Sequence, residues 1–305
     1  MDIVCSIDNN YVKHCCAMLT SFFERNSLGY HTIHLLTEGL ASDNIEIIKT
    51  LVQSYGGNFR YYLIDADYLQ TCPIKVTDHL SIATYYRLFM ADILPQELDK
   101  VLYLDCDLII NREIDELWNT NLQGYALAAV EEMGCSREDV YERLDFDSAY
   151  GYFNAGVLLI NLSYWREHKL SRVFLNYISE KNSKIIAHDQ DVLNAILHDK
   201  CVHLPYKWNV EEGFYHYWFI KKNHFDKKLC HVLRTPGILH YTWKPKPWNA
   251  ECKHPFRIAY FVSLQKTVFR MNVRRYSILS LWIDKYWFCL MMFFRIHGKR
   301  FYRLK

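Results

Sequence analysis

The sequence lacks several features that would assign it to a special class of protein. None of its ten cysteines forms a Cys-x-x-Cys pair, and tetrahedral zinc cages normally use such close ligand pairs. The N-terminus has no basic segment followed by a long apolar run, so we expect no secretory signal. Internal repeats and low-complexity linkers are also absent. Ten cysteines without a signal indicate reduced thiols in a cytosol, buried as small hydrophobic side chains.

Charge is unevenly distributed along the 305 residues. The net charge is only +2, but the segment 266–305 holds ten Lys and Arg residues and one acidic residue, so its own net charge is +9. The rest of the chain is mildly acidic, which argues against a protein that wraps nucleic acid. We therefore expect a main domain over residues 1–265 and a basic, aromatic helical segment over residues 266–305.

Short apolar runs alternate with segments of helical periodicity along most of the chain. We expect strands at 3–7, 31–37, 59–64, 101–104, 125–130 and 156–160. We expect helices at 11–23, from 42 to the glycines at 56–57, and at 84–94, 170–180 and 190–197, and a loop at 236–255. This alternation predicts an α/β fold with a mostly parallel, doubly wound sheet. Ligands of such sheets bind at the carboxyl ends of strands, where Asp8 and Asp105 fall.

Two carboxylates, Asp105 and Asp107, follow the apolar run Leu102–Leu104. Strand alternation sends residues i and i+2 to one side, so both can face one divalent cation. Oxygen ligands suit Mg²⁺ or Mn²⁺, and the imidazole of His240 would favour Mn²⁺. As a bare tripeptide, Asp-x-Asp is more often a solvated turn, so the metal interpretation depends on the buried strand before it. Lys246 follows His240 by six residues and is spaced to reach phosphates held by the metal.

Two further polar motifs have both an ordinary and a functional interpretation. Asp189-Gln190-Asp191 opens a predicted helix. Acidic residues at a helix start commonly cap it and interact favourably with the helix dipole. The same groups can instead face a sugar from the helix N-terminus. Asn154, in Phe153–Gly156, is typical of a turn, but its amide can equally bind a ligand rich in hydroxyls.

Taken in order, these segments resemble glycosyltransferase family 8, close to the bacterial lipopolysaccharide galactosyl- and glucosyltransferases. The resemblance covers roughly residues 1–250. It is carried by residues 3–11, Ala83–Leu88, Lys100–Asp107, Tyr152–Leu162, Asp189–Asn194, His240–Tyr241 and Lys246–Trp248. It implies a GT-A fold, which is a Rossmann-like, mostly parallel mixed sheet flanked by helices. It also implies a UDP-sugar donor, Mn²⁺ with Mg²⁺ as the alternative, and retention of anomeric configuration.

The resemblance also implies roles for individual residues. Asp105, Asp107 and His240 match the metal ligands. Asp8, Asn9, Asn10 and Tyr11 match the nucleoside pocket, where Tyr11 would stack on uracil. Arg87, Asn154 and Asp189 match the groups around the donor sugar. Gln190 matches the residue beneath the anomeric carbon, and Lys246 matches the diphosphate contact.

Two positions depart from the family pattern. Glu132, with Glu131 beside it, stands where an aspartate is usual in the region of the sugar and acceptor. Trp243 stands where a small Gly is usual, although its backbone N–H can still bind phosphate.

We therefore predict a retaining enzyme that moves galactose or glucose from UDP to a saccharide in lipopolysaccharide or other cell-surface glycan biosynthesis. An amide is barely basic, so Gln190 favours a front-face route, with Asp189 and Asp191 as rival nucleophiles. A haloacid-dehalogenase-like phosphatase also begins with Asp-x-Asp after a strand, but Ile109 stands where Thr or Val is usual. A non-catalytic sugar-binding protein is the remaining alternative.

The C-terminal segment contains a nine-residue apolar run, Tyr286–Phe294, flanked by basic residues. It is far shorter than the roughly 20 residues that span a bilayer. Such a segment suits attachment to anionic lipid, with Trp287, Phe288, Phe293 and Phe294 inserted. The alternative is a helix packed on the catalytic domain. We expect a cytoplasmic enzyme, peripheral on the inner face of the membrane, acting on a lipid-linked or lipopolysaccharide acceptor.

Overall fold

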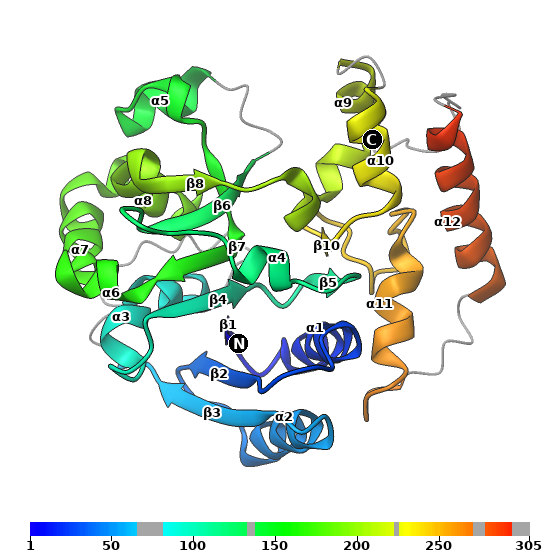
Figure 1. The fold of residues 1–305 in the computed structure, drawn as a ribbon, viewed down its shortest axis with the longest axis horizontal. Coiled ribbons are helices and arrows are strands. Elements are labelled where there is room, and N and C mark those ends of the chain that lie inside the picture. Colours follow the sequence, from blue (N-terminus) through cyan, green and yellow to red (C-terminus); the bar gives the residue numbers. More distant parts are fainter. Residues whose placement is uncertain (66–81, 133–137, 223–225, 271–277, 295–305) are drawn as a thin grey trace. The chain divides into compact units, whose positions relative to one another are not determined.

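A computed structural model describes residues 1–65, 82–132, 138–222, 226–270 and 278–294 (Figure 1). The chain forms two compact units, each built from several stretches. One comprises Met1–Val12, Leu28–Cys106 and Asp115–Leu204, and the other comprises Lys13–Ser27, Asp107–Ile114 and Pro205–Lys305. The boundary that we expect between residues 265 and 266 falls inside the second unit and stays a prediction.

The first unit is built on a mixed sheet of seven strands in the order β3-β2-β1-β4-β7-β6-β8. Their bounds are β1 Asp2–Ser6, β2 Thr32–Thr37, β3 Asn58–Leu63, β4 Lys100–Leu104, β6 Leu127–Glu131, β7 Phe153–Asn161 and β8 Cys201–His203. β7 runs antiparallel to both of its neighbours, and the other pairs are parallel. This confirms the predicted mostly parallel sheet. The apolar sequence of β7 is explained by its position, because all of its residues except the last are buried.

Short helices flank this sheet and complete the first core. They are α2 Ser42–Ser54, η2 Ile82–Phe89, α3 Met90–Ile93, α4 Asp115–Trp118, α5 Glu138–Leu144, η3 Ser148–Tyr150, α6 Leu162–Glu167, α7 Leu170–Lys181, η4 Asn182–Lys184, α8 His188–Leu197 and η5 His198–Lys200. The core between helices and sheet is rich in aromatic residues; Trp165, for example, is fully buried and its indole N–H donates to Ala126 O at 3.0 Å. Burial of such large side chains supplies most of the driving force for this packing.

Two expectations for this unit were wrong in detail. The helix expected at 84–94 is a 3₁₀ helix, η2, followed by the single α-helical turn α3. In a 3₁₀ helix residues i and i+3 lie on one face, and here that alignment lets Thr84 and Arg87 contact the same carboxylate, Asp189. The strand expected to begin at Gly156 begins at Phe153, so Asn154 lies within β7 rather than in a turn before it.

The second unit combines a small sheet with several helices. Its sheet has the order β5-β10-β9, with β10 antiparallel to β5 and parallel to β9. The elements are α1 Val12–Arg25, β5 Leu108–Ile110, η6 Tyr206–Trp208, β9 Val210–Glu211, η7 Glu212–Tyr215, α9 Tyr217–Lys222, α10 Lys227–Arg234, β10 Ile238–His240, α11 Arg257–Leu264 and α12 Ile278–Phe293. The expected loop at 236–255 therefore contains a strand, β10, because its apolar residues pair with β5 and are buried.

Helix α12 has two different apolar faces. One packs against the second unit through Leu281, Phe288 and Met292, in contact with α10 and α11. The other is exposed and carries Leu279, Ile283, Tyr286, Trp287, Leu290 and Phe293. Phe288 is thus buried, at 2% exposure, beside the rings of Tyr215 and Phe256, and its expected insertion into lipid was wrong. Among the described residues, none of the helices is both long enough and apolar enough to cross a membrane.

Candidate active site

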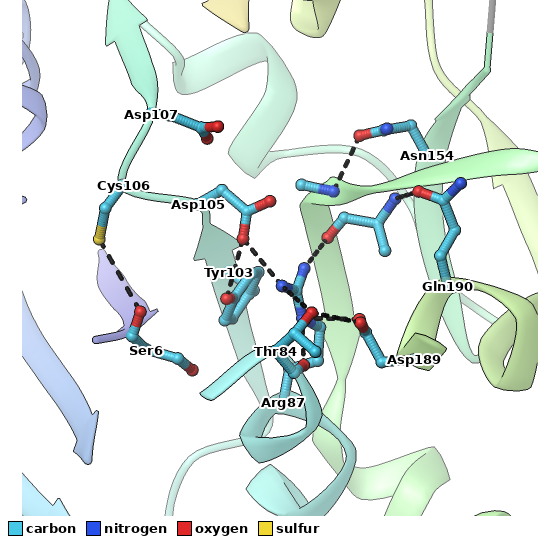
Figure 2. A network of polar contacts seen from close by, with 12 residues as sticks. Ser6, Thr84, Arg87, Tyr103, Asp105, Cys106, Asp107, Asn154, Asp189 and Gln190 are labelled. Carbon is cyan, nitrogen blue, oxygen red and sulfur yellow. Dashed lines mark hydrogen bonds and ion pairs between the residues drawn. The ribbon is translucent and has the colours of Figure 1, made fainter. Parts of the chain in front are cut away.

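Arg87 connects two carboxylates in the first unit (Figure 2). Its Nη2 donates to Asp105 Oδ1 at 2.9 Å, and its Nε lies 2.9 Å from Asp189 Oδ2. Its Nη1 donates to the carbonyl of Ala155, and the guanidinium carbon lies 4.2 Å from the ring centroid of Tyr103. Arg87 is only 4% exposed, so these contacts replace its hydration. The guanidinium therefore fixes the positions of both carboxylates.

Asp189 lies in the first turn of α8 and is buried, at 3% exposure. Burial raises the pKa of Asp189, and the charge of Arg87 opposes that rise. Burial alone would lower the pKa of Arg87, but Asp105 and then Asp189 raise it above its usual value. Helix α8 begins at His188, whose φ of 52° lies in the left-handed region that non-glycine residues rarely adopt. Such backbone strain is found most often at functional sites.

Gln190, the next residue of α8, is held at both ends of its amide. Its Nε2 donates to Glu132 Oε2 at 2.9 Å and to the hydroxyl of Tyr152 at 3.2 Å. Its Oε1 accepts the backbone N–H of Ala155 at 2.9 Å. Since Ala155 also accepts from Arg87, the predicted sugar-facing residues Gln190, Glu132, Asp189 and Arg87 belong to one network of the first unit.

Asp191 differs from its two neighbours because it is fully buried and surrounded by donors. Arg143 contacts both of its oxygens, at 2.7 and 3.1 Å, and the hydroxyl of Tyr152 donates to Oδ1 at 2.8 Å. The backbone N–H groups of Ile186 and Ala187 each donate to Oδ2 at 2.7 Å. These five hydrogen bonds occupy the carboxylate oxygens and disfavour the predicted role of Asp191 as a nucleophile, although that role stays a prediction. They indicate instead that Asp191 anchors the start of α8.

Asp107, which precedes β5 in the second unit, lies between an imidazole and an ammonium. Its Oδ1 is 3.3 Å from His240 Nε2, and its Oδ2 is 2.6 Å from Lys246 Nζ. Burial alone would raise the pKa of Asp107, but Lys246 and then His240 lower it well below its usual range. The ammonium of Lys246 also donates to the carbonyls of Tyr241 and Thr242.

The donor set around Asp107 fits a divalent cation. His240 Nδ1 lies 2.9 Å from Asn209 Oδ1, so it acts as the donor and leaves Nε2 as an acceptor facing the carboxylate. Two acceptors facing each other need a proton or a cation between them. Asp105, the second carboxylate predicted as a ligand, lies two positions before Asp107 in the chain and belongs to the first unit.

The predicted nucleoside residues form a tight turn after β1. The backbone N–H of Asn10 donates to Asp8 Oδ1 at 2.8 Å, and Tyr11 N donates to Asp8 O at 3.2 Å. Asn9 turns toward α2 instead, where its Oδ1 accepts from the backbone of Ala41 at 2.9 Å and from Asn44 Nδ2 at 2.8 Å. Asn9 therefore shapes the turn that carries Asp8, Asn10 and Tyr11.

Two further predicted residues have defined surroundings within their own units. The side-chain carbonyl of Asn154 accepts the N–H of Gly156 at 2.9 Å, which orients its amide within β7. Trp243 is 44% exposed, and its indole meets the ring of His216 edge-on at a centroid distance of 5.0 Å.

Several residues of these networks were not predicted from the sequence: Thr84, Tyr103, Arg143, Tyr152, Asn194 and Asn209. Asn194 joins α8 to β7, because its amide exchanges hydrogen bonds with the backbone of Phe153 at 2.8 Å. Thr84, Tyr103, Tyr152 and Asn194 lie in segments that carry the family resemblance, but no role was predicted for them, and Arg143 and Asn209 lie outside those segments. The helical spacing of Gln190 and Asn194, which places both on one face of α8, was a further available signal.

A model of the family described as "Glycosyl transferase family 8" matches residues 2–252. The chain belongs to glycosyl transferase family 8. Among family relatives, a lipopolysaccharide 1,2-glucosyltransferase of Escherichia coli is 30% identical over 252 residues, covering 80% of this chain and 71% of the relative. General stress protein A of Bacillus subtilis is 27% identical over 266 residues, covering 86% of this chain and 92% of the relative.

The fold is similar to that of a solved glycosyltransferase structure. The crystal structure of galactosyltransferase LgtC with donor and acceptor sugar analogs matches with a TM-score of 0.78 and 26% identity. The match covers 90% of this chain and 99% of the LgtC chain. The match confirms the predicted GT-A fold, and family membership leaves the phosphatase alternative without support.

Proposed function

We propose that this family 8 glycosyltransferase transfers galactose or glucose from a UDP-sugar to a saccharide acceptor with retention of configuration. The observation that carries the proposal is Asp107, whose two oxygens meet an imidazole and an ammonium. The carboxylate of Asp107 and the imidazole of His240 suit a bound cation. The ammonium of Lys246 suits the negative charge of a nucleoside diphosphate. The relatives named as lipopolysaccharide glucosyl- and galactosyltransferases support a hexose donor and a cell-surface glycan as product.

Asp105, Asp107 and His240 would hold Mn²⁺, with Mg²⁺ as the alternative. When bound, the cation supplies Lewis-acid stabilisation of charge on the departing diphosphate. Asn209 supports this assignment by fixing the tautomer of His240. Lys246 carries a positive charge that several acceptors already orient, so it can stabilise the same diphosphate with little reorganisation.

The donor sugar is assigned to the network around Arg87. Asp189, Arg87 and the amide of Asn154 offer acceptors and donors for its hydroxyl groups. Gln190 is assigned to the position beneath the anomeric carbon. Its Oε1 already accepts the N–H of Ala155, which lowers its nucleophilicity further and favours a front-face route over a covalent intermediate. Asp8, Asn10 and Tyr11 are assigned to the nucleoside, with Asn9 holding their turn.

The acceptor region is assigned to Glu132, and Trp243 is assigned to binding of the nucleotide sugar. Glu132 contacts Gln190, so a hydroxyl bound by Glu132 would lie beside the group assigned to the anomeric carbon. The exposed indole of Trp243 offers an apolar face of the kind on which sugar rings pack.

We further propose that the enzyme works in the cytoplasm, attached to the inner face of the membrane by α12. The exposed face of α12 presents Trp287, Leu290 and Phe293, between 47% and 62% exposed. The predicted net charge of +9 over residues 266–305 would attract anionic lipid. Part of that segment, 271–277 and 295–305, lies outside the described residues.

The decisive experiment is calorimetry with a panel of nucleotide sugars in the presence of Mn²⁺, followed by transfer assays on saccharide acceptors. We expect binding of UDP-galactose or UDP-glucose and release of UDP when an acceptor is added. Tight donor binding without turnover on any acceptor would support the non-catalytic alternative. Release of phosphate from a phosphomonoester, with no binding of UDP-sugars, would contradict the proposal.

A further inference from the structure

The segment 246–252 of the second unit carries the lysine assigned to the diphosphate, yet this segment, which the structure describes throughout, forms no helix or strand. Short turns close its backbone instead. The N–H of Asn249 donates to Lys246 O at 2.8 Å, and the N–H of Cys252 donates to Asn249 O at 3.3 Å. Such a segment gains few hydrogen bonds from its own backbone, so groups outside it must satisfy its carbonyls and fix its position.

Arg257, the first residue of α11, binds four backbone carbonyls of this segment. Its Nε donates to Pro247 O at 2.7 Å, and its Nη2 donates to the carbonyl of Asn249. Its Nη1 donates to Ala250 O at 3.3 Å and to Cys252 O at 3.2 Å. Arg257 is only 4% exposed, so these carbonyls take the place of water around the guanidinium. A planar fork of N–H groups can bind such a set at once, which the compact ammonium of a lysine cannot.

Asn249 connects Arg257 to Lys246. Its backbone carbonyl accepts from Arg257, and its side-chain Oδ1 accepts the backbone N–H of Lys246 at 3.0 Å. The ammonium of Lys246 is held separately, 2.6 Å from Asp107 Oδ2 and by two backbone carbonyls. The side chain of Lys246 therefore extends from a backbone that Arg257 fixes to an ammonium that lies beside Asp107.

Trp248 holds the same segment by packing. Its indole stacks on the ring of His14 in α1 at a centroid distance of 3.5 Å, and it lies 5.4 Å from the ring of Tyr260 in α11. The Nδ1 atom of His14 lies 2.8 Å from the hydroxyl of Tyr260. This packing does not involve the guanidinium of Arg257, so altering Arg257 should loosen the segment without unfolding it.

We propose that Arg257 is a positioning residue for the reaction, which acts on the diphosphate through Lys246. Electrostatic stabilisation of a transition state depends on charges that are oriented in advance, so a small displacement of Lys246 would lose much of its effect. This inference rests on the role proposed for Lys246 above. It adds that a residue outside the segment, at the start of α11, sets the position of that lysine.

The test is a double-mutant cycle on UDP-sugar transfer by the full-length chain. Arg257→Lys keeps the positive charge but removes the fork that binds four carbonyls. The kcat of this variant should fall about tenfold, with a smaller change in the KM for the donor. In the Lys246→Ala background the same substitution should change kcat less than about twofold, because the group through which it acts is gone.

Two further variants separate positioning from a loss of stability. Arg166→Lys is the matched control, because Arg166 of the first unit likewise donates to five backbone carbonyls, between residues 91 and 98. It should lower the melting temperature and keep the kcat of the wild type. Asn249→Ala should lower kcat about threefold, again only when Lys246 is present. Asn249 is exposed, so this variant should keep its fold.

Hydrogen–deuterium exchange measures the position of the segment independently of turnover. The amides of residues 246–252 should exchange faster in Arg257→Lys than in the wild type, while those of the seven-stranded sheet should exchange alike. Unchanged exchange at residues 246–252 would overturn the inference.

Three kinetic results would also overturn the positioning role: wild-type kcat in Arg257→Lys, an equal loss of kcat with and without Lys246, or the same loss in Arg166→Lys. The first would show that charge alone suffices, the second that Arg257 acts independently of Lys246, and the third that reduced stability explains the effect. If the wild type transfers no sugar from any UDP-sugar, the proposed function fails instead, and the exchange measurement still decides whether Arg257 positions Lys246.

Discussion

Lys246 and Asp107 form an ion pair in the second unit, with Nζ 2.6 Å from Oδ2. The two residues belong to separate segments, since they are 139 positions apart in the chain. Two backbone carbonyls, those of Tyr241 and Thr242, hold the ammonium in the same place. The lysine is therefore oriented before any substrate arrives, which is the condition for efficient electrostatic stabilisation of a leaving group.

Replacing Lys246 by alanine should lower kcat more than it weakens donor binding. Charge on the diphosphate grows toward the transition state, and removal of one such group typically costs about 3 kcal/mol, roughly a hundredfold in rate. Steady-state kinetics of UDP release measure both quantities. Lys244→Ala is the control, because Lys244 is exposed and two residues away. An unchanged kcat with only a higher KM would show that Lys246 is a uniform binding contact.

Removal of divalent cations should abolish UDP release, and Mn²⁺ should restore it best. Asp107→Ala should lower the rate at least about a hundredfold. Electron paramagnetic resonance of Mn²⁺ measures binding independently of turnover, and Asn209→Ala should weaken that binding about tenfold or more, because it releases His240 Nδ1. Full turnover in a chelator would contradict the metal assignment.

The product should keep the α configuration of the donor, as the resemblance to glycosyltransferase family 8 implies. Gln190, the residue assigned beneath the sugar, is held by Glu132 and by the backbone of Ala155 and is a poor nucleophile, so we expect retention by the front-face route. The anomeric coupling in the proton NMR spectrum of fresh product reports the configuration directly. A β product would refute retention.

Replacing Glu212 by glutamine should make the protein more stable at alkaline pH. Glu212 is 1% exposed, and burial raises its pKa to about 7. The folded protein then binds this proton more tightly than the unfolded chain, so the stabilisation is complete below the unfolded pKa of about 4.5 and is lost as pH rises through about 7. Above that range Glu212→Gln should gain up to about 3 kcal/mol relative to the wild type.

Denaturant unfolding of both proteins across this pH range measures the difference. The control is Glu251→Gln, an exposed carboxylate of the same unit, which should show no such trend. A constant difference between wild type and Glu212→Gln at all pH values would mean that Glu212 does not titrate in this range.

Charged substitutions on the exposed face of α12 should prevent membrane binding without unfolding the protein. Trp287→Glu and Leu279→Glu place a charge where apolar surface would enter lipid, and the exposed side chains have room for it. Val268→Glu is the matched control, since Val268 is 70% exposed but lies outside α12. Co-sedimentation with anionic vesicles measures the effect, and normal binding by both α12 variants would contradict attachment through this face.

Truncation near Lys266 is a less direct test of membrane attachment than these substitutions. It removes Phe288, whose ring packs beside Tyr215 and Phe256. We therefore expect a truncated chain to lose stability as well as vesicle binding.

The sequence by itself predicted most strands of the first unit and several of its helices, because apolar periodicity, caps and chain breakers act within a few residues. It also placed Asp105 and Asp107 directly after a buried strand and identified the family, since the motifs occur in a fixed order along the chain. Lys246 and His240 were likewise recognised from the chain order, whereas the direct contact of Lys246 with Asp107 was not predicted.

Only the tertiary structure decided how distant residues meet. Thr84 and Asp189 are 105 positions apart, yet they share a hydrogen bond beside Arg87, and no local pattern encodes that pairing. The sequence offered both Asp189 and Asp191 as rival nucleophiles, whereas packing gives Asp191 five donors and indicates that it anchors α8. The apolar run Tyr286–Phe294 reads as one hydrophobic segment, but the turn of the helix sends Phe288 into the protein and Trp287 to the surface. Hydrophobicity is a property of each residue, while the side to which a residue turns depends on the surfaces that the folded chain offers to it.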